Sequence, residues 1–181
     1  MITNLIHEER EEADFVIVNP GGLRTVWRPG VIQYQHVYGM SPFSNQVQSF
    51  KIFGHELKAM LRIIQVGQGG FYRTRGLQET INVKQNEKGD LSKKYISGTF
   101  YDGSQIEDEK EYTGLTLDFL LAGGDDFKDV IGKVYTPRGV KYEGDLVKDL
   151  KEGLKKMEVI KEGTLIDPKH PRLILAHVKD D

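Results

Sequence analysis

Residues 118–127 read DFLLAGGDDF, in which an aromatic residue and a glycine pair are followed at once by two aspartates. Two other segments have a similar character, NPGGLR at residues 19–24 and SPFSN at residues 41–45. Each places an aromatic ring or a charged group beside a backbone that glycine or proline makes tight. Together the segments offer two rings, a cation, an anion and two amides. This set suits an aromatic heterocycle that carries a sugar and a phosphate.

Spacing alone leaves two interpretations of each segment open. Arg24 follows a glycine pair whose amides can bind an anion, and its guanidinium suits phosphate or ribose oxygens; the alternative is an ordinary turn with a surface arginine. Phe43 and Phe119 either stack on a base at the mouth of a loop or belong to the core. Asp125 and Asp126 either accept hydrogen bonds from ribose hydroxyls or cap the turn that follows, and we expect capping for at least one of them.

The composition argues against several classes of site. The charge is nearly balanced, at 25 basic against 27 acidic residues, which argues against a nucleic-acid partner. The absence of cysteine removes disulfides, thiolate zinc sites and cysteine nucleophiles. No apolar run approaches the roughly 20 residues of a membrane span. The five histidines lack metal-ligand spacing, and Ser41 and Ser44 have no base near them in sequence, so we expect neither a metal site nor a catalytic residue.

Hydrophobic patterning predicts the main elements. With 181 residues, the chain is long enough for one domain with a hydrophobic core. The patterns predict strands at residues 13–18 and 46–53, a hairpin at residues 95–106, and helices between Gly54 and Gly67 and at residues 145–157. This order indicates an α+β domain with helices packed outside mostly antiparallel sheets.

In their order along the chain, the three segments resemble the C-terminal domain of the 5'-nucleotidase family, which includes UDP-sugar hydrolases and 2',3'-cyclic phosphodiesterases. Residues 19–24 match the family's Asn-Gly-Gly-Gly-Ile-Arg, and residues 41–45 match its Leu-Pro-Phe-Gly-Asn-like turn. Residues 119–127 match its Phe-Leu-Ala-x-Gly-Gly-Asp-Gly-Phe/Tyr. The resemblance covers residues 3–132 and implies the layered α/β/β/α fold of the 5'-nucleotidase C-terminal type.

The resemblance also implies which residues bind a nucleoside or nucleotide: Asn19, Gly21, Arg24, Phe43, Asn45, Phe119 and Asp125. In these roles the two phenyl rings sandwich the nucleobase, the two asparagines hydrogen-bond it, and the glycine backbone approaches it closely. The arginine and the aspartate hold the ribose and a nearby phosphate.

Two departures from the family pattern bear on this site. Pro20 replaces a glycine, which fixes φ and removes one amide donor from the loop. Asp126 replaces the glycine after the motif's aspartate and adds negative charge beside Asp125. We expect each departure to weaken nucleotide binding or to change the preferred substrate.

The resemblance implies that residues 1–181 are a single domain of a longer protein, with residues 163–181 as an extended tail. The family's N-terminal metallophosphatase domain, which this sequence lacks, holds two divalent metal ions of the zinc, manganese, magnesium or cobalt type. We therefore expect a nucleotide-binding domain of a metal-dependent phosphohydrolase of nucleotide catabolism, which is not catalytic alone and has that missing domain as its partner. The alternative is a non-enzymatic interaction module that has kept the fold and lost the ligand. Family members are often exported, periplasmic or surface-bound, which leaves the compartment open, the cytoplasm included.

Overall fold

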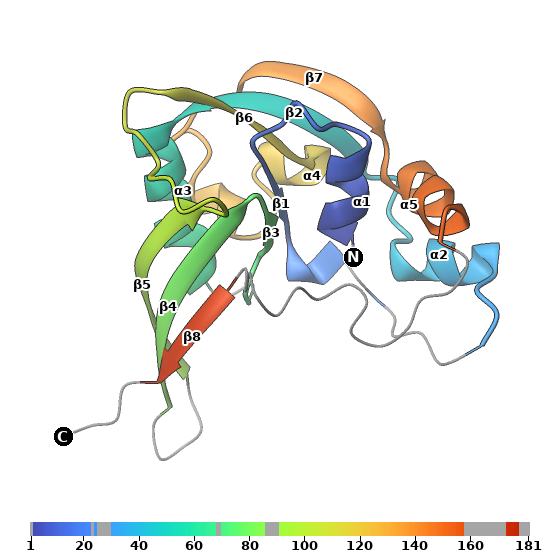
Figure 1. Ribbon diagram of the computed structural model, residues 1–181, viewed down its shortest axis with the longest axis horizontal. Helices are drawn as coiled ribbons and strands as arrows, with labels where there is room; N and C mark the ends of the chain where they lie inside the picture. Colours follow the sequence, from blue (N-terminus) through green and yellow to red (C-terminus); the bar gives the residue numbers. More distant parts are fainter. Residues whose placement is uncertain are drawn as a thin grey trace.

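The structure is a computed structural model that describes residues 2–22, 24, 30–67, 70–85, 91–157 and 173–177. Figure 1 shows two separate sheets, one crossing the top of the molecule and one projecting below it, with helices packed beside them. The helices are α1 (Ile2–Glu8), α2 (Tyr34–Met40), α3 (Gly54–Val66), α4 (Asp118–Leu121) and α5 (Leu146–Lys155), with short 3-10 turns η1 (Pro20–Gly22) and η2 (Asp125–Asp129). Among these described helices, none has the length and apolar character of a membrane span.

The larger sheet has five strands in the order β3-β1-β6-β2-β7. Their bounds are β1 (Phe15–Val18), β2 (Gln46–Phe53), β3 (Arg73–Arg75), β6 (Glu111–Leu117) and β7 (Arg138–Asp145). The β1 and β6 strands are parallel, and the other three pairings are antiparallel. The strand expected at residues 46–53 is confirmed with these same bounds.

The interior strand β1 is covered on both faces, which explains its unbroken apolar sequence. Phe15 and Ile17 face a core that α3 completes, while Val16 and Val18 face a second core built with α1, α2 and α5. All four residues are at most 3% exposed. The helices predicted between Gly54 and Gly67 and at residues 145–157 are confirmed as α3 and α5, and they pack on opposite faces of the sheet.

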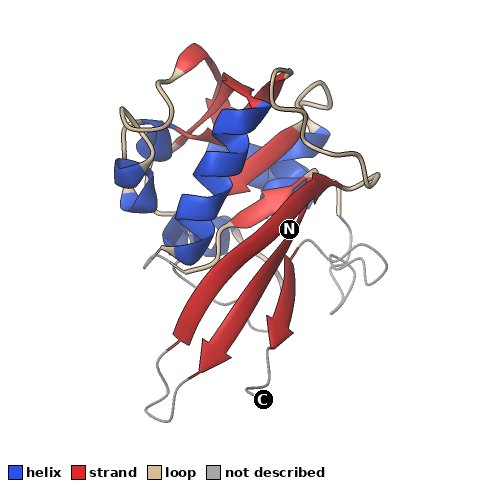
Figure 2. Cartoon of the chain, turned by 90° about the vertical axis from the view of Figure 1, so that its left-hand side faces the viewer, coloured by secondary structure: helices blue, strands red, loops and turns tan. Residues whose placement is uncertain are grey.

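The smaller sheet is formed by β5 (Leu91–Phe100), β4 (Leu77–Gln85) and β8 (Leu173–His177) in that order. The β4 strand pairs antiparallel with β5 and parallel with β8. Figure 2 shows these three long strands extending away from the rest of the domain, with α3 beside their upper end. Of the expected extended tail, residues 163–181, the structure describes only residues 173–177, which form β8.

The α+β class with mostly antiparallel sheets is confirmed, since four of the six pairings between described strands are antiparallel. The hairpin expected at residues 95–106 is confirmed only at its tip, where an antiparallel bridge joins Thr99 to Gln105 and the Phe100 N–H donates to the Ser104 carbonyl at 3.0 Å. The full ladder of β5 forms with the preceding strand β4 instead. The edge strand β7 was not predicted, because its sequence is largely polar and exposed.

The smaller sheet carries a buried carboxyl group, that of Glu79 in β4, which is only 1% exposed. The side-chain amide of Gln65 donates to both carboxyl oxygens, at 2.9 and 3.0 Å, and the Thr74 hydroxyl donates at 3.0 Å. Burial raises the pKa of Glu79 to about 7, and these hydrogen bonds oppose the rise only in part. A group of this kind makes the stability of the fold depend on pH.

The variant Glu79→Gln tests this dependence. Between about pH 4.5 and pH 7 the unfolded chain has lost the Glu79 proton and the folded chain retains it, so the free energy of unfolding falls as pH rises. The free energy of unfolding falls by at most about 3 kcal/mol over this range. A glutamine at position 79 does not ionise, so the variant does not lose this stability. Urea unfolding at intervals from pH 4.5 to 8 should show the variant gaining stability over the wild type with rising pH. The exposed Glu109→Gln serves as the control, and a gap that does not change with pH would contradict the assignment.

Candidate functional site

Three strand ends meet at one edge of the larger sheet. Because β1 and β6 are parallel, the residues that follow them, Asn19 and Asp118, lie at the same edge. Because β2 is antiparallel to β6, the residues that precede Gln46 lie there too. The backbone N–H of Gln46 donates to Asp118 Oδ1 at 3.0 Å, which joins the last two segments. The structure thus brings the three predicted segments together.

A hydrogen bond between two predicted site residues closes this edge. Asn19 Nδ2 donates to Asp125 Oδ2 at 2.6 Å, across 106 positions of the chain. Asn19 is only 4% exposed, and its Oδ1 has no hydrogen-bond partner among the described residues. Buried polar atoms are normally paired, so an acceptor in this state is suited to a donor on a bound molecule.

The backbone at Asp125 is in the left-handed region, with φ of +49°. Aspartate adopts this conformation at some energetic cost, and such residues cluster at functional sites. The capping role expected for one of the two aspartates was wrong, because Gly124 occupies the N-cap position of η2 and no side chain caps it.

The Asp126 side chain packs against the C-terminal end of α3. It is 7% exposed, and its carboxyl group lies directly against the backbone of Gly67 at the end of α3. Its backbone N–H donates to the Tyr72 hydroxyl at 3.2 Å. The two neighbouring aspartates therefore have different surroundings.

Phe119 is at the surface and is 43% exposed, so it does not belong to the core. Its ring lies against Gly124, where a Cβ atom would come within 2.4 Å of two ring carbons. The Gly124 backbone also donates to the Phe119 carbonyl at 2.9 Å. The glycine pair of the DFLLAGGDDF segment thus leaves room for the phenyl ring.

Phe43, 41% exposed, is also outside the core and lies beside a cation. The Arg24 guanidinium carbon is 5.1 Å from the Phe43 ring centroid, within the range of a cation–π contact. The backbone of Asn45 connects this loop to the start of α5. Its N–H donates to the Phe43 carbonyl at 2.7 Å, and its carbonyl accepts from the Leu146 N–H at 3.1 Å.

The η1 turn brings its backbone close to the hydrogen-bonded pair. A Cβ atom placed on Gly21 would lie 3.6 Å from Asn19 Nδ2 and 3.7 Å from Asp125 Oδ2. Pro20 begins this turn, and Gly22 N–H donates to the Asn19 carbonyl at 3.4 Å. The backbone of residues 20–22 therefore forms one wall around the Asn19–Asp125 pair.

Within the described ranges, no three or more His, Asp or Glu side chains gather in a group able to hold a metal ion. The predicted site residues supply two side-chain amides, one carboxylate, one guanidinium and two rings, and the Asp118 carboxylate at the same edge accepts from the Gln46 N–H. This set can bind and orient a polar aromatic molecule. It does not fit a divalent metal, which needs several oxygen or nitrogen ligands.

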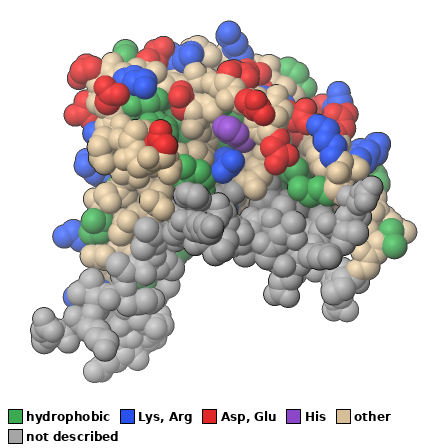
Figure 3. Space-filling model, in the orientation of Figure 1, with side chains coloured by type: hydrophobic (Ala, Val, Ile, Leu, Met, Phe, Trp, Pro, Cys, Tyr) green, Lys and Arg blue, Asp and Glu red, His purple; other side chains and the backbone are tan. Residues whose placement is uncertain are grey.

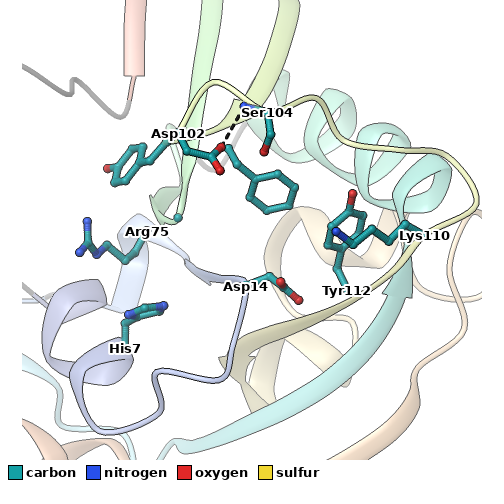
Figure 4. A pocket seen from close by; sticks show the side chains of 10 residues that line it. His7, Asp14, Arg75, Asp102, Ser104, Lys110 and Tyr112 are labelled. Atoms are coloured by element: carbon teal, nitrogen blue, oxygen red, sulfur yellow. Dashed lines mark hydrogen bonds between the residues drawn. The ribbon is translucent and has the colours of Figure 1, made fainter.

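A cavity of about 380 Å³ lies at the other end of β1 (Figure 4). Its lining includes His7, Asp14, Arg75, Tyr101, Asp102 and Lys110, and none of the seven predicted site residues. Since Asp14 precedes β1 and Asn19 follows it, the two places are about 16 Å apart along the strand. Both carboxylates in this cavity accept hydrogen bonds from backbone N–H groups, Asp14 from that of Thr113 and Asp102 from that of Ser104.

Comparison with known proteins shows similarity over most of the chain. A sequence model of the family described as 5'-nucleotidase, C-terminal domain, matches residues 1–133. A 5'-nucleotidase of Vibrio vulnificus is 27% identical over 129 residues, which cover 70% of this chain and 22% of that protein. The NAD 5'-nucleotidase of Haemophilus influenzae is 26% identical over 151 residues, covering 79% of this chain and 24% of that protein. The chain thus spans less than a quarter of the length of these relatives.

Solved structures have the same fold. A 5'-nucleotidase precursor of Thermus thermophilus superimposes with a TM-score of 0.76 at 19% identity, over 96% of this chain and 34% of the other. The NAD nucleotidase of Haemophilus influenzae gives a TM-score of 0.74 at 21% identity, over 98% of this chain and 32% of the other. At these identities the match concerns the fold alone.

Substitutions at Asp125 test the role of its hydrogen bond with Asn19 and of its positive φ. Asp125→Asn should leave the free energy of unfolding nearly unchanged, because asparagine tolerates positive φ and its Oδ1 accepts from Asn19. Asp125→Ala should lower it by about 1–3 kcal/mol, because the buried amide of Asn19 loses its partner. Urea unfolding measures both variants, with the exposed Asp129→Ala as the control. Equal effects of Asn and Ala would contradict the assigned role of the hydrogen bond.

Proposed function

The chain belongs to the family of 5'-nucleotidase C-terminal domains, and from this premise we propose that it binds the nucleoside part of a nucleotide for a phosphohydrolase. The resemblance seen in the three sequence motifs is confirmed by the match over residues 1–133. Proteins of this family are nucleotide phosphohydrolases. This chain would supply the substrate-binding surface of such an enzyme.

The hydrogen-bonded pair of Asn19 and Asp125 is the observation that carries the proposal. The two phenyl rings of the same three segments, Phe43 and Phe119, are both half-exposed. The unpaired Oδ1 of Asn19 would accept an N–H of the base. Asp125 would accept from a ribose hydroxyl, and Arg24 would contact the phosphate. Phe43 and Phe119 would stack on the base, which accounts for two phenyl rings left in solvent.

Hydrolysis would require a second domain. The described residues lack a donor set for the two divalent ions that the family uses, so we derive no hydrolytic step through them. We propose that an N-terminal metallophosphatase domain of the same protein holds the metals and carries the catalytic residues. This chain would then bind and orient the substrate, with no catalytic residue of its own.

The two departures from the family pattern are compatible with binding. The Asp126 carboxyl group is buried against Gly67, so it is not exposed for direct contact with a ligand. Pro20 removes a single amide donor, and the η1 turn still approaches the Asn19–Asp125 pair through Gly21. These positions motivated the alternative of a non-enzymatic interaction module, which their structural surroundings do not favour.

Removal of the Phe119 ring tests the stacking role. Titration calorimetry should detect binding of adenosine or AMP to the wild-type chain, and Phe119→Ala should weaken it by about 1–3 kcal/mol. The matched control is Phe53→Ala, which removes a phenyl ring of similar exposure, 36%, at the opposite end of β2. Equal heats for the wild type and Phe119→Ala would refute the stacking role.

Gly124→Ala provides a second test that leaves the ring in place. The new methyl group would occupy the position of the Phe119 ring and displace it, so the affinity for AMP should fall. In the Phe119→Ala background the same substitution should have no further effect, because no ring remains to be displaced. Additive losses of binding free energy would show that Gly124 acts in another way.

A thermal-shift screen separates binding from the interaction-module alternative. A nucleotide that binds the folded chain at [L] raises stability by RT ln(1 + [L]/Kd). A panel of nucleosides and nucleotides with different bases should therefore include at least one that raises Tm. No shift with any compound at millimolar concentration would favour the module.

A further inference from the structure

The cavity at the start of β1, the Asp14 cavity, contains none of the residues of the proposed nucleotide site. Its volume of about 380 Å³ lies near the lower end of the range for small-molecule sites. Figure 4 shows Arg75 and Lys110 on opposite sides of the cavity, with the Asp14 carboxylate between them. The cavity thus presents a positive, a negative and a positive charge in that order.

The Arg75 guanidinium is suited to binding a carboxylate. Its carbon lies 5.4 Å from the Tyr101 ring centroid, so one face of the group is covered by the ring. Among the described residues, Arg75 forms no ion pair with a carboxylate. A guanidinium stacked in this way still presents the N–H groups of its edge, which bind a carboxylate through two hydrogen bonds.

Lys110 supplies the second cation. Its ammonium lies 5.2 Å from the Tyr112 ring centroid. Within the described part of the chain it has one ion pair, with Glu107, in which the two charged atoms are 4.0 Å apart. Both side chains of this pair are more than half exposed, so the pair is weak and competes little with a ligand.

The Asp14 carboxylate is held in place and keeps one oxygen for a ligand. Its Oδ2 accepts from the Thr113 N–H at 2.7 Å, and the Asp14 N–H donates to the Thr113 carbonyl at 2.9 Å. Its Oδ1 lies outside this bond. The other carboxylate of the cavity, that of Asp102, is engaged by Ser104, whose hydrogen bonds hold the pKa of Asp102 below its usual value.

Backbone contacts fix the walls of the Asp14 cavity. Gly76 has φ of +85°, and a Cβ atom there would collide with the Asp14 carbonyl oxygen, so only glycine lets the Arg75 corner pack against the start of β1. The Gly76 carbonyl accepts from the Tyr101 N–H at 3.1 Å, which joins the turn carrying Asp102 to the same corner. A cavity formed before the ligand arrives costs less conformational entropy on binding.

The charge pattern favours a small ligand that carries both signs. In the lining, the two cations Arg75 and Lys110 are balanced by the carboxylates of Asp14 and Asp102. Figure 3 shows acidic and basic side chains mixed over the described part of one face, with a histidine near its middle and no continuous basic patch. A polyanion would need such a patch, whereas a small molecule with both charges needs only the cavity.

We propose that the Asp14 cavity binds an acidic amino acid, glutamate or aspartate. The α-carboxylate binds the edge of the Arg75 guanidinium, the ammonium donates to Asp14 Oδ1, and the side-chain carboxylate pairs with Lys110. The ligand's two carboxylates and its ammonium thus complement the charges of the cavity. The inference goes beyond the proposed function and does not depend on it, because the two sites share no residue.

Titration calorimetry on the full chain tests the ligand class. It compares L-glutamate with L-glutamine, which lacks the second carboxylate, and with glutarate, which lacks the ammonium. The set of L-aspartate, L-asparagine and succinate repeats the comparison for the shorter side chain. One of the two acidic amino acids should bind at least about tenfold more tightly than both of its analogues, as expected for the loss of one hydrogen bond between charged groups.

Variants assign the binding to the cavity. Arg75→Gln should weaken it at least about tenfold, and Arg73→Gln, which changes an exposed arginine of the same strand outside the lining, should leave it unchanged. Asp14→Asn retains an acceptor for the Thr113 N–H and should remove the preference over the dicarboxylate. Lys110→Gln should remove the preference over the amide. Circular dichroism and Tm establish that each variant is folded.

The outcomes decide this inference separately from the proposed function. Absence of binding by both acidic amino acids at millimolar concentration would overturn it, as would an equal affinity for either analogue. Binding that is unchanged in Arg75→Gln would place the ligand elsewhere and overturn it too. None of these measurements uses a nucleotide, and Arg75→Gln should leave the affinity for AMP unchanged.

Discussion

The parallel pairing of β1 with β6 is the constraint on which the rest of the site depends. Two parallel strands end at the same edge, so Asn19 and Asp118 lie at this edge together although they are 99 positions apart in the chain. The buried hydroxyl of Thr116 strengthens the pairing by donating to the Ile17 carbonyl at 2.8 Å. With β2 antiparallel to β6, the SPFSN segment has no other place to lie. The three motifs meet because the strand directions require it.

The part of the chain beyond the family match is attached to this framework by buried contacts. Leu146, Leu150 and Leu154 of α5 lie in the same core as Val16 and Val18 of β1. In addition, the buried Arg10 guanidinium bonds Asp149 Oδ2 and the Glu143 carbonyl, both at 2.7 Å. A buried ion pair adds little net free energy of folding, but separating the two partners would leave a buried charge uncompensated. The pair therefore fixes the position of α5. Helix α5 is thus held in place by the core.

Sequence reasoning succeeded where burial is periodic and failed where it is not. Strand β2 and helix α3 were predictable because their apolar residues repeat with the period of their own structure. Strand β7 reads RGVKYEGD and lies at the edge of the sheet, so it carries no such repeat. The Asp102-Gly103 turn signal correctly located a turn bridged by Thr99 and Gln105, but a local signal does not reveal that the long ladder of β5 forms with β4.

The site itself was only partly within reach of the sequence. The resemblance identified Asn19 and Asp125, but no spacing rule reveals a hydrogen bond across 106 positions. The contact between Gly124 and the Phe119 ring, and the paired tyrosines of α2, were likewise missed. The tyrosines had a usable signal, since Tyr34 and Tyr38 stand at helical i, i+4 spacing in a polar stretch.

The hydrogen bond between Asn19 and Asp125 engages Asn19 Nδ2 and Asp125 Oδ2. It leaves Asn19 Oδ1 and the second Asp125 oxygen outside the pair. Two acceptors are thereby held in fixed positions before any ligand arrives. In the function that we propose, binding would lose less conformational entropy in ordering these acceptors, and this gain would offset the strained φ of Asp125.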